Sequence, residues 1–154
     1  MIDTPLITQS PEQVTAMIHL KVPCSEIQQV MGPAIQEVYA AIGAQGLKPM
    51  GPWFTYHTRR PTDSFDMEVS VPIDRPITAT GRVKPGKRRA AKVARTVFQG
   101  PYEKLVEGWG EFMDWIEKEG LPTTEDLWES YLVGPETTDN SEEWRTELNR
   151  PLAD

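Results

Sequence analysis

The order of predicted secondary structure repeats along this chain, and the repeat limits the folds open to it. In the first half, alternating apolar and polar residues predict a strand. Pro33 then begins a helix, since proline is tolerated at a first helical position, and Gly46 is a suitable C-terminal cap. Two more alternating strands follow. These elements are expected at Val14–Val22, Gly32–Gly46, Trp53–Thr58 and Phe65–Ile73.

The second half follows the same order. A lead-in, Met1–Pro11, precedes the first half, and we expect it to be loose. Its elements are expected at Ile77–Val83 and Ala91–Phe98 around a basic loop Lys84–Arg89, then at Gly100–Gly120, Leu127–Val133 and Trp144–Leu148. This order predicts one α+β domain with two strand–helix–strand–strand modules, pseudo-repeats at about 12–75 and 76–152. We expect a mainly antiparallel sheet and a cleft between the modules.

Glu129 fits this plan least well. Within the predicted strand Leu127–Val133, Glu129 and Tyr131 share one face and Trp128 lies on the other, and both faces carry large apolar groups. A buried carboxylate is unfavourable unless it is paired or hydrogen-bonded. Either Glu129 forms a structural ion pair with a basic neighbour such as Arg95, or it meets an electron-poor or cationic small molecule in an aromatic pocket.

Charge and composition exclude several classes of protein. The 154 residues carry a net charge of −7, with a pI near 4.9, which argues against nucleic acid as a direct partner. Cys24 is the only cysteine, so no internal disulfide or cysteine-based metal site is expected. No signal peptide is evident, and no run approaches the roughly 18 apolar residues of a membrane-spanning helix. We therefore expect a cytoplasmic protein without a membrane partner.

Several short segments, taken in order, resemble a known family. They are Gly51-Pro52 with Tyr56-His57, Asp66 to Val69 through Pro72-Ile73, Gly100 to Leu105, Trp128 to Tyr131, and Trp144 to Leu148 with Pro151-Leu152. Together they are similar to the GyrI-like small-molecule-binding domain, which is also the effector-binding domain of AraC-type and MerR-type transcription regulators. The resemblance extends from about Val14 to Leu152.

The resemblance implies a duplicated fold with two helices, a curved sheet and a central ligand groove. It also implies an aromatic pocket with one central acid, which matches Glu129, and it places Trp144 beside that acid. Some members sense lipophilic, often cationic, drugs. Stand-alone members include a gyrase inhibitor, toxin-binding proteins and hydrolases that open reactive cyclopropane rings. Because Met1–Gln13 is too short for a helix-turn-helix segment, we expect a stand-alone member without direct control of transcription.

The candidate ligand-binding residues are one acid and five aromatics, and for each aromatic the alternative is ordinary core packing. The set is Glu129, Tyr131, Trp109, Trp144, Tyr56 and Phe54, with Trp53 as the replacement if the opposite strand face lines the pocket. Glu129 and Tyr131 are the catalytic candidates if the protein is an enzyme. No zinc spacing, phosphate-binding loop or dinucleotide fingerprint is present, so no metal or cofactor is expected.

Three functions remain open from the sequence. The first is capture of flat lipophilic, cationic or electron-poor compounds, with a role in drug or toxin resistance. The second is hydrolysis of strained cyclopropane-type electrophiles by Glu129 and Tyr131. The third, from acidic charge and analogy, is inhibition of a DNA enzyme such as gyrase. The sheet edges and a helix face leave room for a homodimer, but no stretch singles one out.

Overall fold

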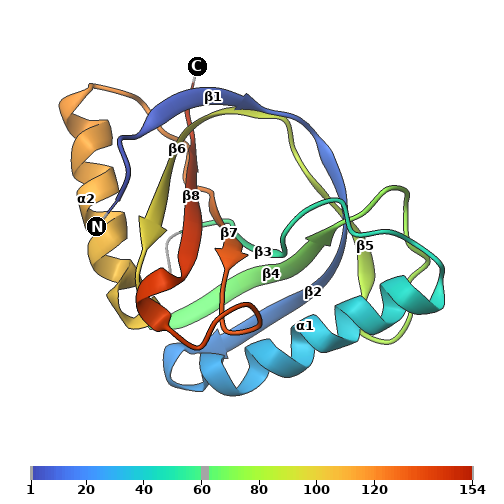
Figure 1. Ribbon diagram of the computed structural model, residues 1–154. Coiled ribbons are helices and arrows are strands. Elements are labelled where there is room, and N and C mark those ends of the chain that lie inside the picture. Colours follow the sequence, from blue (N-terminus) through green and yellow to red (C-terminus); the bar gives the residue numbers. More distant parts are fainter. Residues whose placement is uncertain (1, 60–62, 154) are drawn as a thin grey trace. The chain divides into compact units, whose positions relative to one another are not determined.

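A computed structural model describes residues 2–59 and 63–153, which divide into two compact units. Pro11–Ala90 forms what we call the α1 unit, and Met1–Ser10 with Ala91–Asp154 forms the α2 unit. Each unit holds one long helix and four strands (Figure 1). The strand pairings inside each unit are antiparallel, so the predicted α+β class with mainly antiparallel pairing is confirmed.

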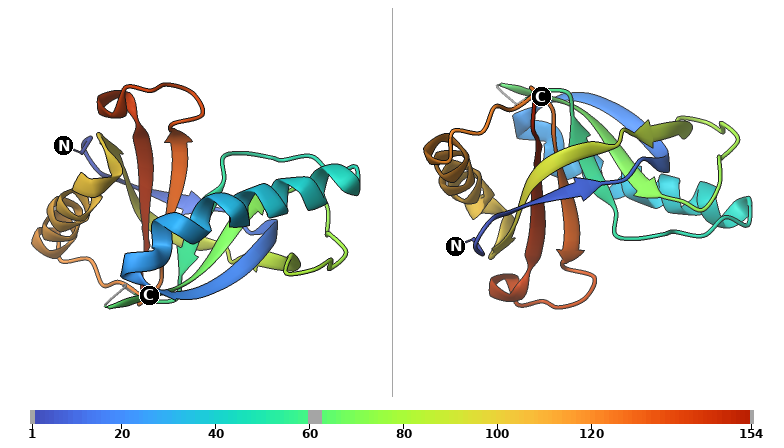
Figure 2. Two further views of the ribbon diagram at one scale, coloured as in Figure 1. Left: turned by 90° about the horizontal axis from the view of Figure 1, so that it is seen from below. Right: turned by 90° about the horizontal axis from the view of Figure 1, so that it is seen from above.

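In the α1 unit the strands lie in the order β3-β4-β2-β5, and α1 packs along β2 and β4 (Figure 2). Apolar side chains from these strands and from α1 form its core. The elements are β2 (Gln13–Pro23), the short 3₁₀ helix η1 (Cys24–Glu26), α1 (Ile27–Ala44), β3 (Phe54–His57), β4 (Ser64–Pro72) and β5 (Lys84–Arg88).

The helix α1 begins earlier than predicted. It starts at Ile27 and contains Pro33, which we had expected near its beginning. Apolar residues at helical spacing explain the extra turn: Ile27 and Val30 pack against the core, and Ala34 is buried in it. Their burial outweighs the hydrogen bond that a proline inside a helix removes.

The segment before residue 90 differs from the prediction. The expected strand Ile77–Val83 is a loop with an isolated bridge between Thr80 and Val83, whereas the expected loop forms β5 and pairs with β2. Ile77 and Val83 are buried within the loop, which produced a strand-like pattern in the sequence. An edge strand needs backbone hydrogen bonds on one side only, so β5 accommodates Pro85 and its charges.

In the α2 unit the strands lie in the order β1-β6-β8-β7. The lead-in that we expected to be loose supplies β1, which pairs with β6 along the edge. Polar residues suffice there, because backbone groups make the pairing. The elements are β1 (Leu6–Ser10), β6 (Ala91–Gln99), η2 (Tyr102–Lys104), α2 (Leu105–Lys118), β7 (Leu127–Val133), η3 (Ser141–Glu143) and β8 (Arg145–Pro151).

The helix α2 lies close against β6 (Figure 2). This approach is possible because Gly108 faces the ring of Phe98. A Cβ atom at Gly108 would overlap that ring, so only glycine permits this approach. Phe112 and Ile116 follow on the same helical face and are buried with Leu148 of β8. This packing fixes α2, the helix that carries Trp109, against β6.

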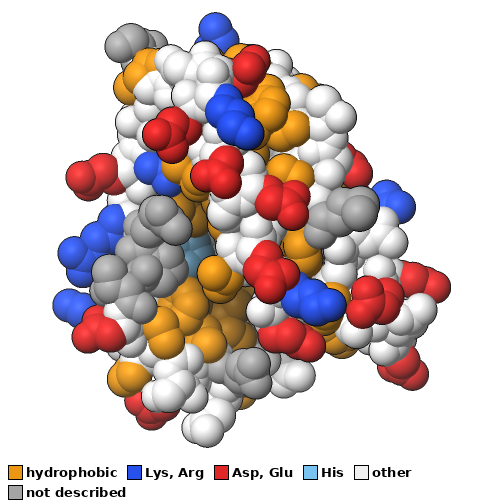
Figure 3. All heavy atoms as spheres, turned by 90° about the vertical axis from the view of Figure 1, so that its left-hand side faces the viewer, with side chains coloured by type: hydrophobic (Ala, Val, Ile, Leu, Met, Phe, Trp, Pro, Cys, Tyr) orange, Lys and Arg blue, Asp and Glu red, His pale blue; other side chains and the backbone are white. Residues whose placement is uncertain are grey.

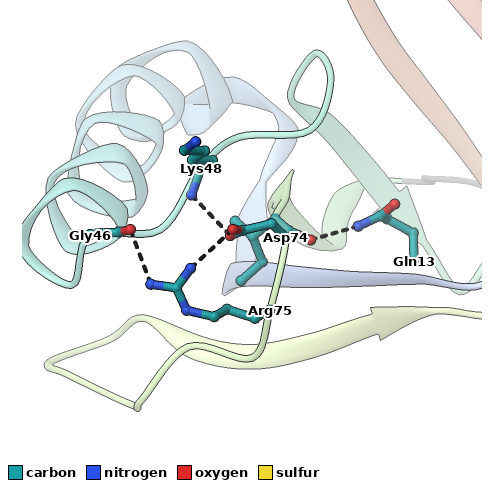
Figure 4. Close-up of polar contacts among 6 residues, drawn as sticks. Gln13, Gly46, Lys48, Asp74 and Arg75 are labelled. Atoms are coloured by element: carbon teal, nitrogen blue, oxygen red, sulfur yellow. Dashed lines mark hydrogen bonds and ion pairs between the residues drawn. The ribbon is translucent and has the colours of Figure 1, made fainter.

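A polar network joins the loop after α1 to the end of β4 (Figure 4). The backbone amide of Lys48 donates to Oδ1 of Asp74 at 3.0 Å, and Arg75 donates to Oδ2 at 3.0 Å. Arg75 also donates to the carbonyl oxygen of Gly46, the residue of positive φ that follows the helix. Across the described ranges, no helix is long and apolar enough to cross a membrane.

Candidate functional site

Glu129 lies near the middle of β7, and its side chain points toward α2. Its cross-strand partner is Leu148, which belongs to the core under that helix. The indole Nε1 of Trp109 donates a hydrogen bond to Glu129 Oε2 at 2.6 Å, and the Tyr131 hydroxyl donates to Oε1 at 2.9 Å. The structure therefore brings three of the predicted site residues into direct contact, on the face that strand alternation predicted.

Burial raises the pKa of the Glu129 carboxyl, while the hydrogen bonds from Trp109 and Tyr131 lower it, and burial is the larger effect. The side chain is nevertheless not fully enclosed, since Glu129 keeps part of its surface exposed. Each carboxylate oxygen accepts one of these two bonds, and a carboxylate offers about four acceptor positions. Glu129 thus retains acceptor capacity for a cation or a water molecule.

The structural alternative for Glu129, an ion pair with Arg95, is absent from the described interactions. Arg95 Nε instead donates to Asn149 Oδ1 at 2.6 Å and lies 3.4 Å from Glu147 Oε1. The Asn149 amide also donates to Glu147 at 3.1 Å. These residues satisfy one another, so Arg95 has a separate structural role.

Tyr102, in η2 at the start of the α2 region, connects two of the predicted aromatics. Its ring contacts Tyr131 edge to face, with centroids 5.9 Å apart, and lies 4.8 Å from Trp144 at an interplanar angle of 35°. Sequence analysis missed Tyr102 as a site residue, although it lies in the Gly100 to Leu105 segment that resembled the family. The resemblance marked that segment but not the residue within it.

Trp144 lies one residue before β8 rather than inside the predicted strand, and its indole Nε1 donates to the carbonyl oxygen of Thr138 at 2.9 Å. Its ring reaches the Glu129 group through Tyr102 and Tyr131. At the other end of the group, the Trp109 ring lies 5.7 Å from Phe112. We call Trp109, Glu129, Tyr131, Tyr102 and Trp144 the aromatic–acid cluster.

The remaining predicted residues belong to the α1 unit, and the contacts described for them are with other residues of that unit. Phe54 is 1% exposed, with the Arg88 guanidinium 4.7 Å from its ring centroid. Tyr56 is partly exposed and faces Glu68 across the β3–β4 pair. Trp53 packs against the core of this unit. Burial raises the pKa of Glu68, so this residue is less solvated than its alternating strand pattern suggested.

No group of three or more His, Cys, Asp or Glu side chains that could hold a metal ion occurs within residues 2–59 and 63–153. The chemistry of the aromatic–acid cluster is that of one carboxylate, two hydroxyls and two indoles. Such a set can pair with a cation, stack against an apolar ring, or orient a water molecule.

The family model described as GyrI-like small molecule binding domain matches residues 4–153. Comparison with curated proteins gave no match. Among solved structures, the EcmrR C-terminal domain is 24% identical, with a TM-score of 0.85 and coverage of 98% of both chains. EcmrR in a DNA complex is 25% identical, with a TM-score of 0.85 and 98% of this chain covered, but this chain spans only 57% of it.

Two more distant structures share the fold. A hydrolase from Listeria innocua is 18% identical, with a TM-score of 0.67 and coverage of 97% of this chain and 91% of that one. SAV2435, solved bound to tetraphenylphosphonium, is 14% identical, with a TM-score of 0.65 and coverage of 98% and 94%.

Proposed function

Because this chain belongs to the GyrI-like small-molecule-binding domain family, we propose that it captures flat, lipophilic cations or electron-poor compounds at the aromatic–acid cluster. One observation carries the proposal: the partly exposed Glu129 carboxylate is held by Trp109 and Tyr131 beside further aromatic rings. The chain's role would be to sequester such compounds, as a protection against drugs or toxins.

The physical argument rests on the burial of Glu129. Burial disfavours the charged carboxylate, and a bound cation would restore part of the lost charge stabilisation. The faces of Trp109 and Tyr131 favour the same ligands, since the negative face of an aromatic ring attracts a cation. A neutral ligand of equal shape would gain the stacking but not the charge pairing.

The surface charge supports the same ligand class. On the side of the molecule where α2 lies, acidic side chains are more widespread than basic ones (Figure 3). A negative surface raises the local concentration of cations and their association rate at low ionic strength. This long-range contribution would fall with added salt, whereas the contact with the partly buried Glu129 would persist.

A titration with matched ligands tests the proposal. The flat cation 10-methylacridinium and its neutral isostere 9-methylanthracene would be titrated against tryptophan fluorescence in the wild type and in Glu129→Gln. We expect the substitution to weaken the cation about tenfold or more, corresponding to about 1.4 kcal/mol, and to leave the neutral compound nearly unchanged. Equal losses for the two ligands would reject Glu129 as a counter-charge.

Glu119→Gln is the matched control for that titration. Glu119 is exposed to solvent and follows the last turn of α2. Ten residues of helical rise, about 15 Å, separate it from Trp109. The Glu119→Gln substitution removes one negative charge, as Glu129→Gln does. Any general effect of net charge on cation binding would therefore appear in both variants.

A second function uses the same residues, and the hydrogen bond between Tyr131 and Glu129 is the observation that favours it. In a hydrolase, Glu129 would take a proton from water as the water oxygen bonds to the strained ring carbon. The ring bond breaks toward the electron-poor part of the substrate, whose oxygen Tyr131 would stabilise by turning its hydroxyl proton from Glu129 to that oxygen. The proton taken from water is then returned to the product. A raised carboxyl pKa suits a general base.

Mass measurement separates binding from hydrolysis. A cyclopropane electrophile would be incubated with substoichiometric protein, and repeated gain of one water per substrate would indicate turnover. Turnover that persisted undiminished in a Glu129→Gln, Tyr131→Phe double variant would exclude these two residues. Recovery of every compound intact, with saturable binding, would favour sequestration.

A further inference from the structure

A second carboxylate lies at the Tyr102 end of the aromatic–acid cluster. Glu136 follows β7 on an exposed loop. A Cβ built on Gly134 would lie 2.8 Å from the Tyr102 hydroxyl and 2.9 Å from Glu136 Oε2. The hydroxyl and the carboxylate therefore approach the same point of the backbone from different parts of the chain, and a side chain at Gly134 would interfere with that approach.

The loop that carries Glu136 is tied down by its own hydrogen bonds. The backbone amides of Thr137 and Thr138 donate to the Gly134 carbonyl at 2.9 and 3.1 Å, which closes a turn around Glu136. The carbonyl of Thr138 accepts the indole proton of Trp144 at 2.9 Å. The turn is thus connected to the same aromatic ring that stacks on Tyr102, and this limits the positions that Glu136 can take.

Tyr102 lies within the influence of both acids. Burial raises the pKa of its hydroxyl to about 12, with additional contributions from the negative charges of Glu136 and then Glu129. The hydroxyl forms no hydrogen bond with any residue in the described part of the chain, so its proton remains available to a ligand. Two carboxylates accordingly act on one aromatic group, Glu136 near its Tyr102 end and Glu129 beyond Tyr131.

We propose that Glu136 is a second anionic contact of the ligand site and that the site prefers elongated aromatic dications over monocations. This inference rests on the proposed binding function. One positive centre would pair with Glu129, and the other would lie near Glu136 while the linking portion passes the rings. Tyr102 separates Tyr131 from Trp144 by centroid steps of 5.9 and 4.8 Å, which supplies apolar surface between the charges.

The test compares butyltriphenylphosphonium with bis(triphenylphosphonium) alkanes of increasing chain length. Dissociation constants would be measured by calorimetry for the wild type, Glu136→Gln, Glu129→Gln and the control Glu119→Gln. We expect the wild type to prefer one chain length of dication. Because Glu136 is exposed, we expect Glu136→Gln to weaken that dication only about fivefold and to leave the monocation unchanged.

The outcomes of this test separate the two proposals. If the monocation binds and Glu129→Gln weakens it, but Glu136→Gln affects monocation and dication equally or neither of them, the second contact is rejected and the binding function stands. If neither compound binds the wild type, the binding function itself fails. Selective loss of the dication in Glu136→Gln, but not in Glu119→Gln, supports the inference.

Gly134→Ala provides a second variant that leaves every charge in place. Gly134 does not have a positive φ, so alanine can adopt its backbone conformation. The added methyl group would force apart the Tyr102 hydroxyl and the Glu136 carboxylate. We expect loss of the dication preference with the monocation retained; an unchanged preference in this variant would contradict the proposed geometry.

Discussion

The hydroxyl of Tyr131 donates a hydrogen bond to the carboxylate of Glu129, two residues earlier on the same strand, at 2.9 Å. Residues two apart on a strand share a face, so β7 alone brings this pair together. Trp109 of α2 supplies the other donor, at 2.6 Å. The strand β7 therefore supplies Glu129 and Tyr131, and the packing of α2 brings in Trp109.

Trp109→Phe removes the indole donor and keeps an aromatic ring. Because the Trp109 hydrogen bond lowers the pKa of Glu129, the variant should have a higher pKa at this carboxyl. Cation binding needs the ionised form, so its loss on acidification should begin at a higher pH. Carbon NMR titration of the Glu129 carboxyl measures the shift without a ligand. Trp115→Phe, on the same helix, is the control. In this variant we expect the Glu129 carboxyl to behave as in the wild type.

The stability of Glu129→Gln relative to the wild type should rise with pH. Burial raises the folded-state pKa of Glu129 above its ordinary 4.5, so the ionised carboxylate reduces stability as pH rises above that value. The variant lacks this penalty. Urea unfolding at pH 4 and pH 7 should show its relative stability increasing with pH. A variant that became relatively less stable at pH 7 would contradict the role of burial.

Gly108→Ala should destabilise the α2 unit by about 1–2 kcal/mol, because overpacking against Phe98 exceeds the gain in helix propensity. Gly110→Ala is the matched substitution. Gly110 lies on the same helix with no atom within 4 Å of an added Cβ, so the variant should be more stable by about 0.5–1 kcal/mol. Chemical denaturation of both variants measures the difference, and equal effects would contradict the close contact.

His57 should make stability fall on mild acidification. It is 3% exposed, and burial lowers its pKa from 6.5 to about 4. Between these values the unfolded chain binds a proton that the folded chain does not, so stability decreases as pH falls through this window, by up to about 3 kcal/mol. Urea unfolding from pH 7 to pH 4 should show a shallower dependence in His57→Gln. An unchanged slope in His57→Gln would contradict the burial of a neutral imidazole at this position.

Asp74→Ala should loosen the junction between the loop after α1 and the end of β4. The Lys48 amide would lose its acceptor, so its hydrogen exchange should accelerate about fivefold, equivalent to about 1 kcal/mol. Asp74→Asn keeps an acceptor oxygen and should protect the Lys48 amide nearly as well. Unchanged exchange in the alanine variant would show that the amide is protected by the backbone alone.

Local sequence patterns predicted part of the geometry of the aromatic–acid cluster. Alternation along β7 placed Glu129 and Tyr131 on one face, and the helical apolar stripe included Trp109; these patterns depend on residues close in sequence. Tyr102 could not be found in that way, because its contacts with Tyr131 and Trp144 form only when distant segments pack. Family resemblance marked its segment without indicating which residue would join the cluster.

The edge strands were harder to predict than the core elements. β1 and β5 are joined to their neighbours by backbone hydrogen bonds, and these depend little on side-chain type. Lys84–Arg88 therefore resembled a solvated loop, whereas Ile77–Val83 resembled a strand because its buried ends are apolar. A hydrophobic pattern indicates which side chains are buried. It does not predict strand pairing in a segment whose side chains are exposed.

The placement of β1 also has a consequence for synthesis of the chain. The α1 unit is one continuous stretch, Pro11–Ala90, and every strand of its sheet is available once that stretch has left the ribosome. β1 is made first, yet its partner β6 lies beyond the whole α1 unit. The nascent chain thus carries β1 without its partner strand while the middle of the protein folds. During this interval a chaperone could bind β1 and prevent it from pairing with another strand.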